Sequence, residues 1–191
     1  MLENFEIFNL SLNFKYLMSA ILFVRHGQDK RGKYAHDERL TEDAKEDIAQ
    51  FTEKMVLHFG FPDLIYYSPF MRTRETTKYI LRKLKELKQE NEKEKYVKIK
   101  CEPKLGRFFT SYERREPDIS DSTMRRNPII NDNKKQFHDR IKKILRKVQY
   151  KSKKHNLNIW NITHTLVLLH VAELNSIERN PHVEYLDFVK V

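Results

Sequence analysis

Three segments of the sequence carry side chains suited to binding a phosphate group. Each segment comes at the end of an apolar stretch, and the side chains in question are Arg25, His26, Arg72 and His164. A guanidinium offers forked N–H donors that match two phosphate oxygens, which the ammonium of lysine does not. Two arginines and two histidines on one rim would form a cationic pocket of the size of a tetrahedral dianion.

The apolar stretches before these residues are typical of buried strands in a parallel sheet. The first of them, ILFV, is followed abruptly by large polar groups and a glycine. Open α/β sheets place their chemistry beyond the carboxyl ends of the strands. We therefore expect three strand ends to meet at one edge of a sheet, directly after Val24, Tyr67 and Thr163.

The whole chain alternates strand-like and helix-like segments. Runs rich in branched and aromatic residues predict strands at 21–24, 63–69, 97–101, 157–163 and 184–191. Apolar residues at helical spacing predict helices at 41–59, 71–87, 134–154 and 165–174. This alternation predicts an α/β protein, a three-layer α/β/α sandwich around a mostly parallel sheet. The third strand has one polar side, which favours a place near the sheet edge.

The composition fits one domain with a well-solvated surface. The chain has 191 residues, enough to bury a full core, and 34% of them are charged. No apolar stretch approaches the roughly 20 residues of a membrane span. The single cysteine, Cys101, excludes a disulfide within the chain and favours a reducing compartment. We expect a cytoplasmic protein with no membrane partner.

Residues 1–17 are expected to be an N-terminal extension ahead of a single domain, 18–191. They are apolar and aromatic, but they lack the basic start and small-residue cleavage site of a secretory signal. The extension is either an upstream start that adds little to the fold, or a strand or short helix packed on the domain. We favour the first of these interpretations.

The predicted helix 134–154 holds nearly all of the formal net charge of +10. It carries ten lysines or arginines against one acidic residue, Asp139. Such a segment can collect nucleic acid or anionic substrates by long-range attraction. A solvated helix face is the favoured interpretation, because no nucleic-acid-binding signature accompanies it.

Four motifs in this sequence resemble those of the histidine phosphatase, or phosphoglycerate mutase-like, superfamily, in its phosphatase branch. In chain order the matching residues are Arg25, His26 and Gly27; Asp37, Leu40 and Thr41; Ser68, Pro69, Arg72, Thr73 and Thr76; and Thr163 and His164. The motifs occur in the family's order over the chain from about residue 18 to the end. The resemblance implies the α/β/α fold of that family.

The resemblance also implies a role for each matched position. His26 would attack phosphorus and form a phosphohistidine that water hydrolyses, with no metal or cofactor. The equatorial phosphate oxygens would be held by Arg25, Arg72 and His164, each contributing on the order of 3 kcal/mol to the barrier reduction. Further substrate-binding positions are expected at Gly27, Gln28, Thr165 and Arg107. The apolar strand before His26 would then hold the nucleophile in a fixed position.

The sequence departs from the family at the general acid. Many members carry a glutamate after the third strand, where the stretch PKLGRFF here places Arg107. An arginine cannot donate a proton at neutral pH. Glu113 and Glu102 are the candidates to replace the acid, with Glu116 and Asp118 in the same irregular segment.

Three interpretations of function remain. The first is a phosphatase that hydrolyses phosphomonoesters through His26, on a phosphorylated small molecule or a phosphoprotein. The second is a phosphohistidine phosphatase, because an imidazole leaving group can accept its own proton and needs no acid. The third is a catalytically weak homologue that binds phosphorylated or nucleic-acid partners. A mutase is the least favoured, since it needs both the acid and additional loops.

Overall fold

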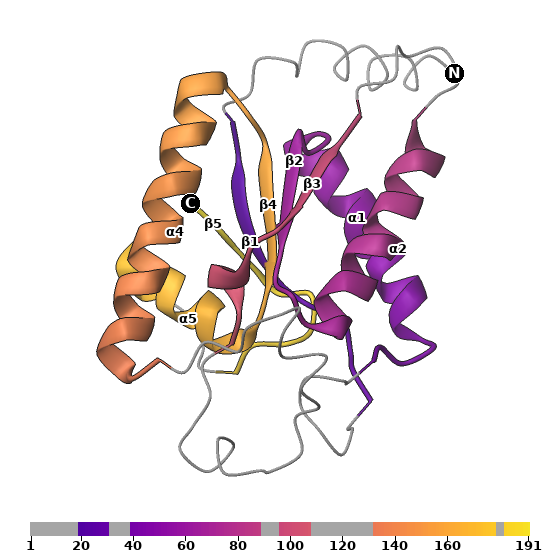
Figure 1. Ribbon diagram of the computed structural model, residues 1–191. Helices are drawn as coiled ribbons and strands as arrows, with labels where there is room; N and C mark the ends of the chain where they lie inside the picture. The colour runs from indigo at the N-terminus through magenta and orange to yellow at the C-terminus, as the bar shows by residue number, and fades with distance from the viewer. Residues whose placement is uncertain (1–18, 31–38, 89–95, 108–131, 179–181) are drawn as a thin grey trace.

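The computed structural model describes residues 19–30, 39–88, 96–107, 132–178 and 182–191. Within these residues the chain forms a central sheet between two layers of helices, as Figure 1 shows. The predicted α/β/α sandwich is therefore confirmed. The N-terminal extension and three of the acid candidates, Glu113, Glu116 and Asp118, lie outside the described residues.

The sheet contains five strands in the described part of the chain, in the order β3-β2-β4-β1-β5. Their bounds are Ile21–Arg25 for β1, Leu64–Tyr67 for β2, Lys98–Cys101 for β3, Ile159–Thr163 for β4 and Phe188–Lys190 for β5. The first four are parallel, and β5 is antiparallel to β1. The strand predicted at 184–191 is shorter, because Tyr185 and Leu186 form a turn in which Leu186 has a φ of 61°.

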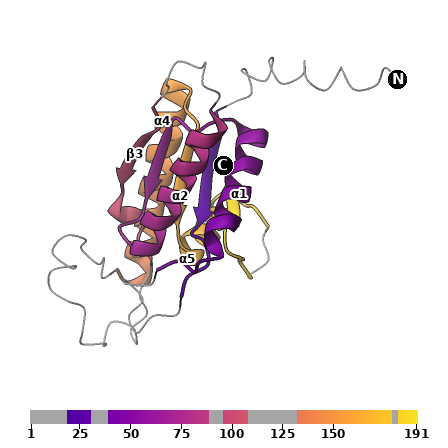
Figure 2. The ribbon, with the colours of Figure 1, turned by 90° about the vertical axis from the view of Figure 1, so that its right-hand side faces the viewer.

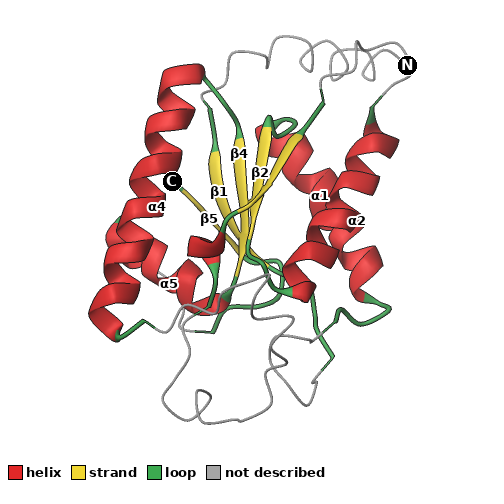
Figure 3. Ribbon diagram, in the orientation of Figure 1, coloured by secondary structure: helices red, strands yellow, loops and turns green. Residues whose placement is uncertain are grey.

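In the described residues, α1 and α2 cover one face of the sheet and α4 and α5 the other, and Figure 3 shows these helices in red on either side of the strands. Their bounds are Ala44–Phe59 for α1, Met71–Leu87 for α2, Lys134–His155 for α4 and Thr165–Leu174 for α5, with a short 3₁₀ turn, η2, at Pro103–Leu105. α1 begins three residues later than predicted. The hydroxyl of Thr41 accepts a hydrogen bond from the N–H of Ala44 at 3.3 Å, so Thr41 precedes the first turn instead of belonging to it.

Alternate residues of the strands face opposite helix layers, which divides the core into two clusters. In β1, Leu22 and Val24 pack with α1 and α2, while Ile21 and Phe23 pack with α4 and α5. Both faces of this strand are buried, which is why its sequence is apolar throughout. Figure 2, turned by 90°, shows α1 and α2 in front of the sheet.

The strand register brings three carboxyl ends to one edge of the sheet. Arg25 pairs with Thr163 in the neighbouring strand, and Tyr67 pairs with Ile162. Whatever follows β1, β2 and β4 must therefore meet at the lower edge of the sheet in Figure 1. None of the helices in the described residues is long and apolar enough to cross a membrane.

Candidate active site

His26 lies directly after β1, with only 4% of its surface exposed. Its backbone N–H donates to the carbonyl of Thr163 at 3.1 Å, which ties the residue to the end of β4. Its ring Nδ1 lies 2.8 Å from the carbonyl oxygen of Gly27. A carbonyl can only accept a hydrogen bond, so the proton of the neutral ring is on Nδ1. The lone pair of Nε2 is left available for attack on an electrophile.

His164 meets His26 because it follows the strand paired with β1. The two ring centroids lie 5.3 Å apart at an interplanar angle of 64°. Nε2 of His164 shares a 2.9 Å hydrogen bond with the hydroxyl of Ser68, the residue that follows β2. The ring of Phe70 packs edge-on against His164 at 4.9 Å, which together with Ser68 fixes the orientation of the imidazole.

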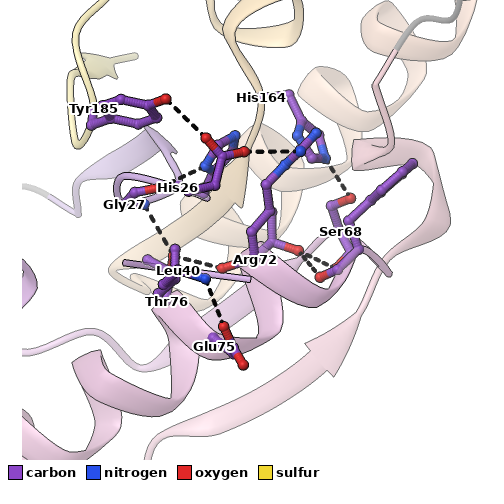
Figure 4. A network of polar contacts seen from close by, with 12 residues as sticks. His26, Gly27, Leu40, Ser68, Arg72, Glu75, Thr76, His164 and Tyr185 are labelled. Carbon is purple, nitrogen blue, oxygen red and sulfur yellow. Dashed lines mark hydrogen bonds and ion pairs between the residues drawn. The ribbon is translucent and has the colours of Figure 1, made fainter. Parts of the chain in front are cut away.

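Arg72 enters the same site from the first turn of α2. Its guanidinium is 4% exposed and donates from Nη1 to Asp29 at 2.9 Å. The second oxygen of Asp29 accepts a hydrogen bond from the hydroxyl of Tyr185 at 2.8 Å. Figure 4 shows Arg72 and Tyr185 near the ring of His26.

Arg25 is held by the segment that precedes β5. It donates from Nη1 to the carbonyl of Val183, and its guanidinium carbon lies 4.0 Å from the ring centroid of Tyr185. The same ring lies 5.9 Å from that of His26. Tyr185 is therefore packed between the cation and the imidazole.

Gly27 leaves room for α1 to approach the loop after β1. A Cβ atom there would lie 2.9 Å from Cδ1 of Ile48, a contact that only a shift of the chain or of Ile48 could relieve. The N–H of Gly27 donates to the hydroxyl of Thr76 in α2 at 3.1 Å. Both helices of this layer thus fix the backbone that follows His26.

Burial and nearby cations keep both histidines neutral. Desolvation and, next to it, the positive charge of Arg72 lower the pKa of His26 from 6.5 to about 3, although the carbonyl of Gly27 and the charge of Asp29 act in the opposite direction. The pKa of His164 is also lowered well below its usual value, first by burial and then by Arg72. Neutral imidazole is the form that can act as a nucleophile.

The other predicted substrate-binding positions lie around this rim at different depths. Gln28 is exposed and Thr165 half-buried at the start of α5. Arg107 is half-buried, and its charge contributes to the lowered pKa of both Arg72 and His164. Arg74, which follows Arg72 in the sequence, is exposed.

Glu102 is placed against α4. Its carboxylate forms an ion pair with Lys147 and accepts a hydrogen bond from the N–H of Lys104 at 3.3 Å. With 6% of its surface exposed, this carboxylate is committed to structural contacts. None of the contacts of Glu102 within the described residues joins it to His26.

Sequence reasoning missed two members of the site, Asp29 and Tyr185. Asp29 stands two residues after the Arg-His-Gly motif. An acidic residue so close to basic site residues could have indicated that it pairs with one of them. Tyr185 falls within the strand predicted at 184–191. No spacing in the sequence connects it to Asp29, which lies 156 positions away. In the described residues, no group of three or more His, Cys, Asp and Glu side chains is arranged to hold a metal ion.

A sequence profile described as the histidine phosphatase superfamily, branch 1, matches residues 21–175. The chain belongs to this superfamily. The match spans β1 to α5 and so includes every strand end described above. No curated protein sequence matches the chain.

Solved structures of histidine phosphatase and mutase type share the fold of this superfamily member. The ecdysone phosphate phosphatase of Bombyx mori, in complex with tungstate, has a TM-score of 0.65 at 16% identity, over 90% of this chain and 88% of that one. The phosphoglycerate mutase of Bacillus anthracis has a TM-score of 0.63 at 18% identity, over 91% and 87%. The protein histidine phosphatase SixA, complexed with tungstate, has a TM-score of 0.57 at 14% identity, over 90% and 86%.

Proposed function

We propose that this member of the histidine phosphatase superfamily hydrolyses phosphomonoesters through a phosphohistidine on His26. The observation that carries the proposal is the hydrogen bond of its Nδ1 to the carbonyl of Gly27 at 2.8 Å. It leaves Nε2 unprotonated on a ring that burial keeps neutral. A nucleophile in this state needs no separate base to remove a proton before it attacks.

The reaction has two displacement steps. In the first, a bond forms between Nε2 of His26 and phosphorus while the ester P–O bond breaks, and the leaving oxygen takes up a proton from water. In the second, a water oxygen bonds to phosphorus, the N–P bond breaks and the water releases a proton. Arg72, Arg25 and His164 stabilise the charge on the equatorial oxygens in both steps.

The helix starts add to this stabilisation. α2 begins at Met71, next to Arg72, and α5 begins at Thr165, directly after His164. The amino ends of helices carry a partial positive charge. Both helices therefore favour an anion between the two histidines.

A second candidate, hydrolysis of a phosphohistidine P–N bond, is favoured by the position of Arg107. Its charge acts on Arg72 and His164, yet it has no proton to give to a leaving alkoxide. Glu102 is bound to Lys147 instead. A protonated imidazole leaves as a neutral group and needs no acid. One of the structural relatives is named as a protein histidine phosphatase.

Replacement of His26 tests the proposal. We expect His26→Ala and His26→Gln to lower turnover of an aryl phosphate by about 10³-fold or more, because no other group can form the covalent intermediate. Circular dichroism confirms that each variant is folded. The exposed His155, at the end of α4, provides the control variant His155→Ala, which should keep full activity. Acid-labile, base-stable radioactive phosphate should be trapped on His26 alone.

Retained activity in both His26 variants would remove the nucleophile assignment. Comparison of an aryl phosphate, an alkyl phosphate and phosphoramidate then distinguishes the two candidates. Turnover of phosphoramidate with none of the alkyl ester indicates P–N hydrolysis, since only the alkyl ester needs a proton donor. No turnover of any of the three favours the third interpretation, a binding protein.

A further inference from the structure

Asp29 places a carboxylate on the guanidinium that the proposed function assigns to phosphate. One carboxylate oxygen lies 2.9 Å from Nη1 of Arg72, with the two side chains 13% and 4% exposed. The other oxygen accepts the hydroxyl proton of Tyr185 at 2.8 Å. Both oxygens accept hydrogen bonds, which is the pattern of an ionised carboxylate. Figure 4 shows Arg72 and Tyr185, the two partners of this carboxylate, near His26.

The backbone holds this carboxylate in position. Asp29 pairs with Leu40 in an isolated antiparallel bridge. On either side of it, the N–H of Thr41 donates to Gln28 at 2.9 Å and the N–H of Lys30 donates to Arg39 at 2.8 Å. The contact with Arg72 therefore arises from a fixed loop and not from a free surface side chain.

Asp29 accepts from Nη1 of the guanidinium that the proposed function assigns to a phosphate oxygen, so the two anions share one cation. Arg72 and the two histidines are each only 4% exposed, so the repulsion between the carboxylate and a bound anion is weakly screened. A dianion entering between the histidines must either displace Asp29 from Arg72 or remain next to it. Each alternative costs binding free energy, and the cost rises with the charge of the anion.

We propose that Asp29 determines the charge selectivity of the site by competing with the substrate for Arg72, which weakens the binding of dianionic phosphoryl groups more than that of singly charged ones. The inference rests on the proposed phosphate pocket, but not on turnover. Tyr185 supports it by anchoring the second carboxylate oxygen. Asp29 is thus a specificity-determining residue.

Calorimetric titration with tetrahedral oxyanions of fixed charge tests the inference on the full chain. Asp29→Asn keeps the shape of the side chain and one of its two acceptor oxygens, and it removes the charge. We expect the variant to bind the dianion sulfate about tenfold more tightly, and the monoanion perchlorate only about threefold, because half the charge feels half the repulsion. Inorganic phosphate should follow sulfate.

Two further variants complete the design. Glu75→Gln removes a charge one helical turn along α2 from Arg72, where the carboxylate accepts from the N–H of Leu40 at 2.9 Å. It should change sulfate affinity by less than about twofold. Tyr185→Phe keeps the ring and removes the anchoring hydroxyl. It should tighten sulfate binding by less than Asp29→Asn does.

Unchanged or weaker sulfate binding in Asp29→Asn overturns the inference, as does an equal gain for sulfate and perchlorate. A loss of kcat on alkyl phosphates without any gain in anion affinity would make Asp29 a proton donor and not a competitor. If the wild-type chain binds these anions but hydrolyses nothing, the proposed function fails while the affinity pattern still decides the inference.

Discussion

At the scale of single residues, the state of His26 depends on what surrounds it. The ring is buried beside Arg72, and only the carbonyl of Gly27 and the charge of Asp29 favour a proton on it. A histidine with a pKa of about 3 is neutral throughout the physiological range. The same environment that keeps the imidazole neutral lowers the stability of the fold at acid pH.

The pH dependence of stability follows from this lowered pKa. In the unfolded chain His26 has its ordinary pKa of 6.5, so between pH 6.5 and about 3 the unfolded state binds more protons than the folded state. Stability is therefore lost as the pH falls through this range, by up to about 1.4 kcal/mol per pH unit for one histidine. His164 adds to the loss in the same direction.

Urea unfolding at pH 7 and pH 4.5 measures this effect. We expect the His26→Gln variant to lose less stability between the two pH values than the wild type, because Gln cannot take up a proton. His155→Gln, at an exposed position, should follow the wild type. A wild-type loss equal to that of His26→Gln would mean that His26 is protonated in the folded state.

At the scale of elements, helix α1 packs directly against the backbone that follows His26. Ile48 is completely buried, and its Cδ1 occupies the space that a side chain at Gly27 would need. The hydrogen bond from Gly27 to Thr76 binds the same loop to α2. Close approach of α1, and not backbone conformation, is the reason for a glycine here.

The Gly27→Ala variant tests this packing. We expect it to lose about 1–3 kcal/mol of stability and to lower turnover, since either Ile48 or the loop of His26 must move. Ile48→Val removes Cδ1 and by itself costs about 0.5–1.5 kcal/mol. In the double variant the two losses should be less than additive, as denaturant unfolding can show. Additive losses would mean that Ile48 is not the obstacle.

At the scale of the whole molecule, α4 supports the site from the opposite layer. Arg140 is a buried member of the basic helix, and its Nη1 donates to the carbonyls of Lys104 and Gly106 at 2.6 and 2.9 Å. Its Nε pairs with Asp132 at 2.5 Å. These bonds hold the backbone that directly precedes Arg107.

Arg140→Met tests this link across the layers. We expect a loss of about 2–4 kcal/mol in stability, because Asp132 and two carbonyls lose their donor. KM for an aryl phosphate should rise more than kcat falls, since Arg107 is displaced while His26 is not. Arg146→Met, an exposed position on the same helix, should stay within about 0.5 kcal/mol of the wild type. Equal changes in stability and in KM for the two variants would contradict a role of Arg140 in positioning Arg107.

The number of basic residues in α4 does not show which of them face solvent. Its lysines and arginines include Arg140, which is buried, and Lys147, which is paired with Glu102. Others, such as Lys143 and Arg146, are exposed. The helix thus combines a solvated face with cations used inside the fold, and composition cannot separate the two.

The order of strands and helices was predictable from the sequence because burial imposes its own periodicity. A strand buried on both faces must be apolar throughout, as β1 is, and helices that cover a sheet must carry one apolar face. Parallel strands then bring their carboxyl ends together, so His26, Arg72 and His164 could be assigned to one rim without coordinates. The weakest assignment was the last strand, because the turn at Tyr185 interrupts an alternating pattern that resembles a strand.

The directions of individual side chains were decided only by the tertiary structure. Sequence placed Glu102 near the site, but its carboxylate turns to Lys147, and sequence gave no reason to join Asp29 to Arg72 and Tyr185. A side chain's direction depends on which partners the packed layers bring within hydrogen-bonding distance. Those partners are far apart in the chain, and local patterns contain no information about them.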